Sequence, residues 1–249
     1  MHVERLGDHG PRILLIHGST SPGWATWAAQ RELAQEGYRL IVPHRSGYPP
    51  NPPLERIDFA VQAREMTELI EPGTHLVGHS YGGVIALLAA GLVPDRVRSL
   101  CVIEPPALGL ARGNADVEAA IDRVMAAFET PGTVREHFVR FLAAVGSRAK
   151  VPETLTPAME ASVRATLVER PPFEAAFDFN ALRARAFPIL VVSGGHDRAA
   201  EAVCDVLERE LRAERVVIRG AGHSVQRTGG AFNARLRALV DAAEERAGG

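Results

Sequence analysis

A serine framed by glycines is the first group in this sequence whose type and setting could do chemistry. Gly78-His79-Ser80-Tyr81-Gly82 follows an apolar run that predicts a buried strand and precedes an Ala- and Leu-rich stretch that predicts a helix. A serine on such a turn has a strained backbone, and its hydroxyl stands above the sheet at a helix N-terminus, where N–H groups favour negative charge. Ser80 is therefore a candidate nucleophile, although an N-cap serine in a glycine-rich turn would give the same letters.

A serine hydroxyl becomes a good nucleophile when a histidine takes its proton and a carboxylate orients that histidine. His223 is the candidate base, because it follows a Gly-Ala-Gly loop after a predicted strand, and small neighbours let such a loop approach the serine. Two carboxylates follow other predicted strands: Asp197, after a Gly-Gly-His turn, and Glu104. The carboxyl ends of parallel strands meet at one edge of a sheet, so these groups can come together there.

The sequence does not contain the residue patterns of a dinucleotide-binding site, a disulfide framework or a metal site. Gly220 and Gly222 lack the third glycine of a dinucleotide-binding turn. Cys101 and Cys204 lie far apart in apolar segments, where small buried side chains are the simpler interpretation. The spacing of histidines, cysteines and carboxylates along the chain is not that of a metal site. We therefore expect neither a cofactor nor a metal ion.

Short apolar runs alternate with helical patterns in both halves of the chain, which predicts parallel strands joined by helices. Between about residue 105 and residue 187 this alternation stops, and only helical patterns separated by proline or glycine occur. We therefore predict an α/β fold with a mostly parallel, doubly wound sheet, in which residues 1–104 and 187–249 form the core and residues 105–186 form an inserted helical cap. Strands are expected at residues 12–16, 38–42, 74–78, 97–103, 188–192 and 215–218, and helices at 24–35, 57–70, 81–92, 117–128, 134–144, 159–168, 173–182, 200–211 and 230–247.

Together these motifs resemble the α/β-hydrolase fold family over nearly the whole chain. Residues Gly78 to Gly82 match the family's nucleophile elbow position by position, and the His-Gly-Ser sequence ending at Ser19 is similar to its oxyanion loop. The loop at residues 44–48 departs from the family, because it lacks the acidic residue that members often have there. The resemblance rests on the elbow first and on the order of the other motifs second.

The resemblance implies a catalytic triad and an oxyanion hole. The chain order Ser80, Asp197, His223 is the order expected of this fold, so Asp197 is the favoured acid. Glu104 is the alternative, because some relatives carry the acid on that earlier strand. The backbone amides of Ser19 and Tyr81 would form the oxyanion hole. The helical insertion is similar to the cap that many members carry over the site, and its aromatic residues suggest a mainly apolar pocket.

The implied function is a serine hydrolase that acts on a small or medium, largely apolar carboxylic ester through an acyl-enzyme intermediate. Serine at the elbow argues against the epoxide hydrolases and haloalkane dehalogenases of the same fold, which use aspartate as the nucleophile. Two alternatives stay open: a hydrolase of C–C bonds in a diketone-like acid, whose typical loop is partly echoed by residues 19–23, and a ligand-binding or non-hydrolytic member of the fold.

Composition limits the partners of this chain of 249 residues. With 28 Lys and Arg against 30 Asp and Glu, and a net charge of -2, it lacks the basic surplus of a duplex-binding protein. The start is polar, and the nearly apolar stretch at residues 82–93 is shorter than the ~18 residues that a membrane span needs. We expect a cytoplasmic protein with a small-molecule substrate and no nucleic-acid or membrane partner. The sequence carries no signal for its oligomeric state.

Overall fold

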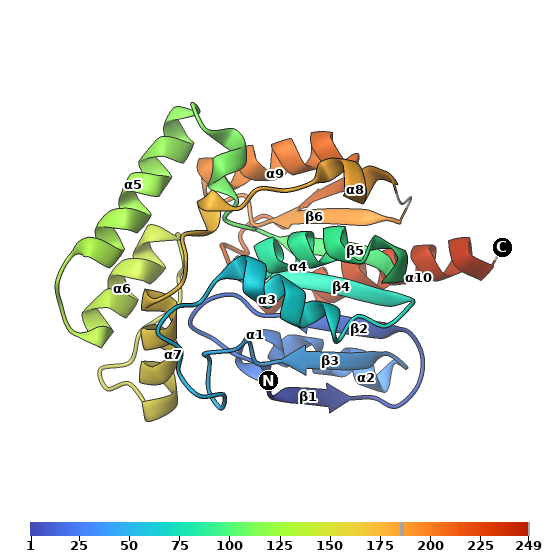
Figure 1. Cartoon of the computed structure of the whole chain (residues 1–249), viewed down its shortest axis with the longest axis horizontal. Helices are drawn as coiled ribbons and strands as arrows, with labels where there is room; N and C mark the ends of the chain where they lie inside the picture. The colour runs from blue at the N-terminus through green and yellow to red at the C-terminus, as the bar shows by residue number, and fades with distance from the viewer. Residues whose placement is uncertain (185–186, 249) are drawn as a thin grey trace.

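A mostly parallel sheet organises the chain, whose computed structural model describes residues 1–184 and 187–248 (Figure 1). Within these residues the sheet has seven strands in the order β1-β3-β2-β4-β5-β6-β7. The edge strand β1 pairs antiparallel with β3, and each other neighbouring pair is parallel. The strands are β1 (Val3–Leu6), β2 (Arg12–Ile16), β3 (Arg39–Pro43), β4 (Thr74–His79), β5 (Val97–Ile103), β6 (Ile189–Ser193) and β7 (Glu214–Val217).

Helices cover both faces of the sheet, because successive side chains of each buried strand point to opposite sides. On β2, Leu14 and Ile16 pack into one core, whereas Ile13 and Leu15 pack into the other. The first core is closed by α3 (Phe59–Thr67), α4 (Tyr81–Leu92), α8 (Phe179–Ala184) and α9 (Arg198–Leu211); the second by α1 (Trp24–Trp27), α2 (Glu32–Gln35) and α10 (Gly230–Gly248). The doubly wound α/β architecture predicted from the sequence is confirmed.

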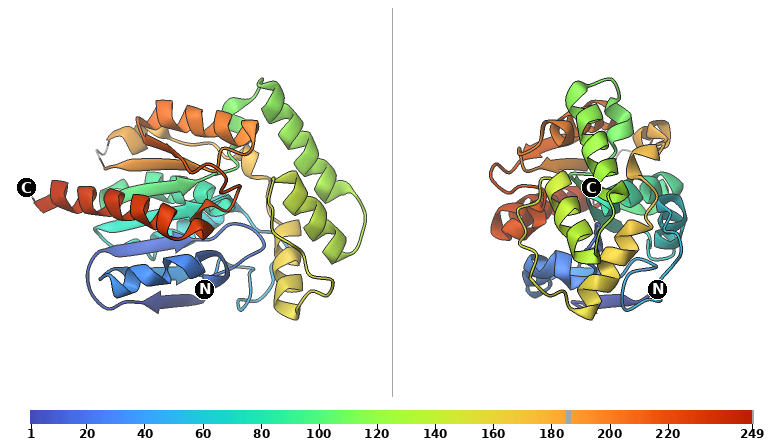
Figure 2. Two further views of the ribbon diagram at one scale, coloured as in Figure 1. Left: turned by 180° about the vertical axis from the view of Figure 1, so that it is seen from behind. Right: turned by 90° about the vertical axis from the view of Figure 1, so that its left-hand side faces the viewer.

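The chain between β5 and β6 forms helices at the carboxyl ends of the parallel strands (Figure 2). They are the 3₁₀ turn η3 (Leu108–Ala111), α5 (Ala115–Glu129), α6 (Val134–Ala144), α7 (Pro157–Leu167) and η4 (Pro172–Glu174). The chain then returns along one face of the sheet, where α8 lies beside α9 (Figure 1). Their starts carry strong signals: Asn114 caps α5, and Thr133 with Glu136 forms a capping box on α6. We call residues 105–184 the helical insertion.

The structure differs from the sequence prediction at three elements. β1 was not expected, because its four residues Val-Glu-Arg-Leu are half polar and lie at the sheet edge. The helix expected at residues 24–35 is two short α-helices joined by a 3₁₀ turn, η1 (Ala28–Arg31), in which Gln30 donates a hydrogen bond to the carbonyl of Gln226. The helix expected at 173–182 is replaced by η4 and α8, separated by an extended segment.

The remaining expected elements agree with the structure to within a few residues at their ends. The last two residues of the expected cap, 185 and 186, and residue 249 of the expected core lie outside the described residues. Across the described part of the chain, no helix combines the length and the apolar character that crossing a bilayer requires.

Candidate active site

Ser80 lies on a strained turn between β4 and α4. Its φ of 53° and ψ of -125° fall in a region that residues other than glycine rarely adopt. The turn needs glycine on both sides: a Cβ on Gly78 would lie 2.3 Å from the carbonyl oxygen of Gly82, and a Cβ on Gly82 would lie 2.2 Å from that of Ile16. The backbone around Ser80 thus has the geometry that the Gly-x-Ser-x-Gly pattern predicts.

The imidazole of His223 is held by Glu104, the residue that follows β5. Nδ1 of His223 lies 2.8 Å from Oε2 of Glu104, while Oε1 accepts a hydrogen bond of 2.7 Å from the amide of Gly194. Glu104 itself has a positive φ of 44°, and its amide donates to the carbonyl of Val192 on the neighbouring strand. A carboxylate only accepts, so Nδ1 of His223 carries the proton and Nε2 is left as a base.

The buried Glu104 carboxyl is ionised at neutral pH. Burial alone would raise its pKa, but the contacts with His196 and His223 and the hydrogen bond from the Gly194 amide lower the pKa to about 2. His196 approaches the other carboxylate oxygen, with Nδ1 3.2 Å from Oε1. That contact with Glu104 raises the pKa of His196 against the opposing effect of burial. Two histidines therefore share one carboxylate.

Asp197 occupies a different position from the one expected for it. Its Oδ1 accepts hydrogen bonds from the amides of Ala199 and Ala200 and so caps the N-terminus of α9, and its Oδ2 lies 3.0 Å from the guanidinium of Arg123 on α5. The expectation that Asp197 would orient His223 is therefore corrected: the carboxylate on the imidazole is that of Glu104, the alternative from the sequence. Aspartate is a preferred N-cap, which accounts for its place in the Gly-Gly-His-Asp turn.

Two buried histidines position the loops around Ser80. Nε2 of His79 lies 3.0 Å from the carbonyl oxygen of His223, and burial, with a smaller contribution from the neighbouring His223, lowers the pKa of His79 to about 3. His17 accepts a hydrogen bond at Nε2 from the amide of Arg45, and its Nδ1 lies 2.7 Å from the carbonyl of Gly18. Burial, followed by the charge of Arg45, lowers the pKa of His17 well below its usual value. Both rings are therefore neutral, and their hydrogen bonds hold the neighbouring loops in place.

The two residues expected to supply the oxyanion hole, Ser19 and Tyr81, line the same cavity as Ser80. Tyr81 is the first residue of α4, so its amide has no acceptor within the helix and is free to bind an anion. Ser19 lines the same cavity as Ser80, and its hydroxyl donates a 2.5 Å hydrogen bond to Oε2 of Glu169. The loop that carries Ser19 is thus joined by a hydrogen bond to the segment that follows α7.

Glu169 belongs to a buried polar cluster that the sequence analysis missed. Its Oε1 lies 2.6 Å from the guanidinium of Arg45 and accepts a 2.8 Å hydrogen bond from the hydroxyl of Tyr48. The Arg45 side chain is fully buried and also donates to Gln62 and to the carbonyl of Gly18. The signal in the sequence is Arg45, a charged residue in the loop at residues 44–48. It does not reveal the cluster by itself, because its partner Glu169 lies 124 residues away.

A cavity of about 230 Å³ lies between Ser80 and the helical insertion. Ser80, His223 and Glu104 line it from the sheet side together with Asp197 and His196. Most of the insertion's contribution is apolar, from Leu108, Val124, Met125, Phe128, Phe141, Leu167 and Phe173. The geometry places a strained serine and a carboxylate-bound histidine in the wall of one apolar chamber.

Comparison with protein families identifies this arrangement. The family model described as "Alpha/beta hydrolase family" matches residues 13–235, most of the chain. The chain belongs to the alpha/beta hydrolase family. The family resemblance drawn from the elbow motif is thereby confirmed.

Curated relatives in the alpha/beta hydrolase family differ in the reactions in their names. Epoxide hydrolase 3 of Siraitia grosvenorii is 30% identical over 152 residues, which are 55% of this chain and 47% of that protein. Pimeloyl-[acyl-carrier protein] methyl ester esterase of Aeromonas salmonicida is 30% identical over 151 residues, 58% of each chain. This chain spans about half the length of these relatives.

Solved alpha/beta hydrolase structures share the fold over almost the whole chain. A carboxylesterase structure from Nitrososphaera gargenis has a TM-score of 0.68 at 16% identity and covers 98% of this chain and 95% of its own. A thermophilic esterase from Thermogutta terrifontis has a TM-score of 0.64 at 23% identity, with 96% and 93% covered. At these identities the likeness establishes the fold.

Proposed function

We propose that this protein is a serine hydrolase that acts on a small or medium, largely apolar carboxylic ester, or a related acyl substrate, through an acyl-enzyme intermediate. One observation carries the proposal: the His223–Glu104 pair lies in the same apolar cavity as the strained Ser80. The methyl ester esterase among the relatives supports the choice of an ester. A serine at the elbow weighs against the epoxide-opening reaction of the other relatives.

The chemistry follows from the protonation states of the site. Oγ of Ser80 attacks the ester carbonyl while Nε2 of His223 takes the hydroxyl proton, and the imidazolium that forms is stabilised by Glu104. Collapse of the tetrahedral intermediate breaks the ester C–O bond, and His223 returns the proton to the leaving alcohol. Water then attacks the acyl-enzyme with His223 again as base, which releases the carboxylic acid and restores Ser80.

Charge that develops on the carbonyl oxygen requires hydrogen-bond donors near Ser80. The amide of Tyr81 has the dipole of α4 behind it, and the Ser19 amide would be the second donor. Both are main-chain groups, so their positions depend on the loops that carry them. The Glu169–Ser19 hydrogen bond supports the second loop from the insertion side.

The lining of the cavity supports an apolar substrate over the diketone-like acid considered from the sequence. Arg123 is the arginine among the described lining residues, and its guanidinium is already paired with Asp197. An arginine neutralised in this way is a poor receptor for a substrate carboxylate. The aromatic and aliphatic side chains of α5, α6 and η4 suit a hydrocarbon acyl or alcohol group instead.

Labelling with a fluorophosphonate, followed by mass location of the adduct, tests the nucleophile. We expect one adduct per chain on Ser80, no adduct in Ser80→Ala, and normal labelling in Ser147→Ala, whose serine lines a neighbouring small cavity. Turnover of p-nitrophenyl esters of increasing acyl length should fall by at least about 10³-fold in Ser80→Ala. The length at which turnover drops would report the depth of the cavity.

Two outcomes would contradict the proposal. An adduct that persists in Ser80→Ala would move the nucleophile elsewhere. A wild-type protein that gives no adduct, or gives a single slow turnover and retains its ligand tightly, would favour a ligand-binding member of the fold.

A further inference from the structure

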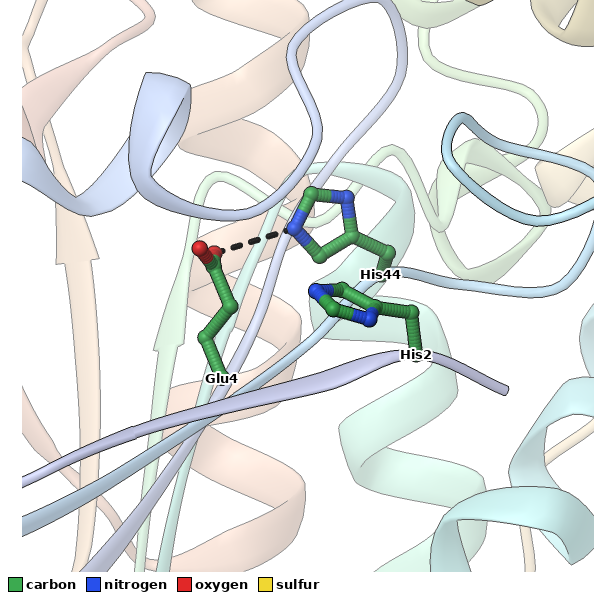
Figure 3. A group of neighbouring side chains, drawn as sticks. All are labelled: His2, Glu4 and His44. Atoms are coloured by element: carbon green, nitrogen blue, oxygen red, sulfur yellow. Dashed lines mark hydrogen bonds and ion pairs between the residues drawn. The ribbon is translucent and has the colours of Figure 1, made fainter.

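Three side chains with metal-binding atoms converge at the edge of the sheet, outside the cavity that contains Ser80. They are His2, Glu4 on β1, and His44, which follows β3 (Figure 3). One nitrogen or oxygen atom from each lies within 4.8 Å of the others. We propose that His2, Glu4 and His44 form a binding site for a first-row divalent cation, with Zn²⁺ as the best-matched ion.

The hydrogen bonding of His44 directs its second ring nitrogen, Nε2, toward Glu4. Nδ1 lies 2.6 Å from the carbonyl oxygen of Pro49, and because a carbonyl can only accept, Nδ1 carries the proton. In the neutral ring, Nε2 then has a lone pair, and it lies 3.0 Å from Oε2 of Glu4 (Figure 3). Two acceptors this close need a positive charge between them, either a proton or a metal ion.

The position of His2 favours the metal ion. A proton shared by Glu4 and His44 needs no third group, yet a ring nitrogen of His2 also lies within 4.8 Å of the donor atoms of both residues, and the His2 ring packs edge-on against that of His44 with centroids 5.0 Å apart. The backbones are held together as well: the amide of His44 donates to the carbonyl of His2, and Asn51 accepts from the amide of His2 and donates to the carbonyl of His44. The three ligands are therefore brought together before any ion binds.

Two imidazoles and one carboxylate form a common ligand set for zinc. Donor atoms on one tetrahedral Zn²⁺, each at about 2.0–2.1 Å, are about 3.4 Å apart. The 3.0 Å between Glu4 and His44 and the 4.8 Å limit for the group bracket this value. The Pro49 carbonyl supplies the outer hydrogen bond that usually orients a ligating histidine.

Space for the ion depends on Gly23. A Cβ at this position would lie 2.2 Å from Nε2 of His44 and 3.0 Å from Oε2 of Glu4, so any other residue would cover the edge of the imidazole. Glu4 is 34% exposed and His2 is exposed, which leaves room for water as a further ligand. The bound ion would link β1 and the chain before it to the loop that leads into Arg45.

The site also explains why the sequence analysis predicted no metal. Glu4 and His44 are 40 residues apart, and the pairing of β1 with β3 brings them together. β1 is the strand that was not predicted from the sequence. The ligand set is a product of the register, in which Val3 faces Pro43 and Glu4 faces Val42.

Equilibrium dialysis of the untagged full-length protein against Zn²⁺, with the bound metal counted, tests the site. A second group, Glu104, His196 and His223, also has its donor atoms within 4.8 Å, so the measurement is made in the His223→Ala background, which removes one of its ligands. We expect one Zn²⁺ per chain in that background, and at least a tenfold weaker affinity when His2→Ala is added.

His9→Ala is the matched control for His2→Ala. His9 is also an exposed histidine near the N-terminus with a carboxylate, Asp8, beside it, but it belongs to neither group of three ligands. Its removal should leave zinc binding unchanged. In the same background, zinc at about 100 times its Kd should raise Tm by on the order of 5 °C or more, and the rise should disappear with His2→Ala.

The proposal is overturned if the His223→Ala protein binds no zinc, if His2→Ala binds it as tightly as its parent, or if His9→Ala weakens binding equally. None of these measurements uses catalytic activity, so they are independent of the proposed hydrolase function.

Discussion

Glu104 and Asp197 both follow strands of the sheet and both line the cavity, but their oxygens have different partners. Glu104 accepts from His223 and Gly194, whereas one oxygen of Asp197 is occupied by the first turn of α9 and the other by Arg123. Only Glu104 can therefore stabilise a positive imidazole directly. This difference lies in individual hydrogen bonds and is best tested by isosteric amides.

Glu104→Gln should lower kcat/KM on the best p-nitrophenyl ester by on the order of 10²- to 10⁴-fold. The amide can donate to Nδ1 and so stabilise the wrong tautomer of His223, which would leave no base at Nε2. Steady-state kinetics on the purified variant, with circular dichroism to verify its fold, measures the effect.

Asp197→Asn is the matched control, because asparagine is an equally good N-cap and the change removes only the charge facing Arg123. Its kcat/KM should stay within about tenfold of wild type. A larger loss in Asp197→Asn than in Glu104→Gln would return the role of the acid to Asp197.

The sequence predicts which residues could form the site better than it predicts which of them contact one another. The sequence predicts Ser80 and His223 as site residues because each lies in a glycine-framed loop at the end of a strand. The partner of His223 is harder to predict, because Asp197 and Glu104 each follow a strand of the sheet. What separates them is that Asp197 accepts hydrogen bonds from the first amides of α9, whereas Glu104 contacts His223. The burial of Glu169 could not be predicted from the sequence, because it depends on long-range packing against Arg45.

At the scale of elements, the helical insertion and the core are joined through the segment after α7. The amide of Ile57 donates to the carbonyl of Val168, and the amide of Arg170 donates back to the carbonyl of Ile57. Between these bonds Glu169 reaches the buried Arg45. Burial of that guanidinium would lower its pKa, but the Glu169 carboxylate outweighs the effect and raises it.

Glu169→Gln should lower the free energy of unfolding by about 3 kcal/mol, because it leaves a buried arginine without its counter-ion. The change also weakens the acceptor of the Ser19 hydroxyl, so kcat should fall together with stability. Urea unfolding followed by tryptophan fluorescence measures the first effect, and ester turnover measures the second.

Glu174→Gln is the comparison for this change. Glu174 forms a partly exposed ion pair with Arg170 on the same segment, and pairs of this kind contribute about 0–1 kcal/mol. Equal stability losses in the two variants would show that Glu169 has no special role in joining the insertion to the core.

Elements with a continuous apolar pattern could be predicted from the sequence, and elements defined by pairing could not. β5 (Val97–Ile103), α4 and α6 were predicted to the residue, because apolar runs and caps set their bounds. β1 is held by its antiparallel partner β3 and carries half-polar residues, so nothing in its own composition marks it. The α8 region was misjudged because its aromatic residues pack against the first core without forming a single helix.

The molecule as a whole should lose stability on mild acidification. His17 and His79 are buried and neutral, and burial lowers the pKa of His79 to about 3, whereas an unfolded histidine titrates near 6.5. A lowered folded-state pKa means that the unfolded chain binds the proton first. The contribution to stability is therefore complete above about pH 6.5 and is lost as the pH falls toward 3.

At pH 5, His79 alone should reduce the free energy of unfolding by about 2 kcal/mol relative to pH 8. Urea unfolding at intervals between pH 5 and pH 8 measures this slope. His79→Gln, which keeps a donor for the carbonyl of His223, should flatten the slope, and the exposed His9→Gln should leave it as in wild type. A slope that His79→Gln does not change would contradict the assignment.

The overall architecture was predictable because alternating buried strands and amphipathic helices leave few ways to cover both faces of a sheet. The relative positions of the elements could not be predicted in the same way. For example, the contact of Arg123 on α5 with Asp197 depends on packing between segments that are far apart in the sequence.

Glu104 is the last residue of the core, directly before the helical insertion, and this position has a consequence for chimaeras. A crossover placed before Glu104 would import the histidine's carboxylate together with the donor's helices, at a position whose φ of 44° must be reproduced. A crossover placed directly after Glu104 would keep the carboxylate with its own sheet. Recombination between homologues that exchanges the chamber wall while keeping the reacting groups intact therefore has its first permissible junction immediately after Glu104.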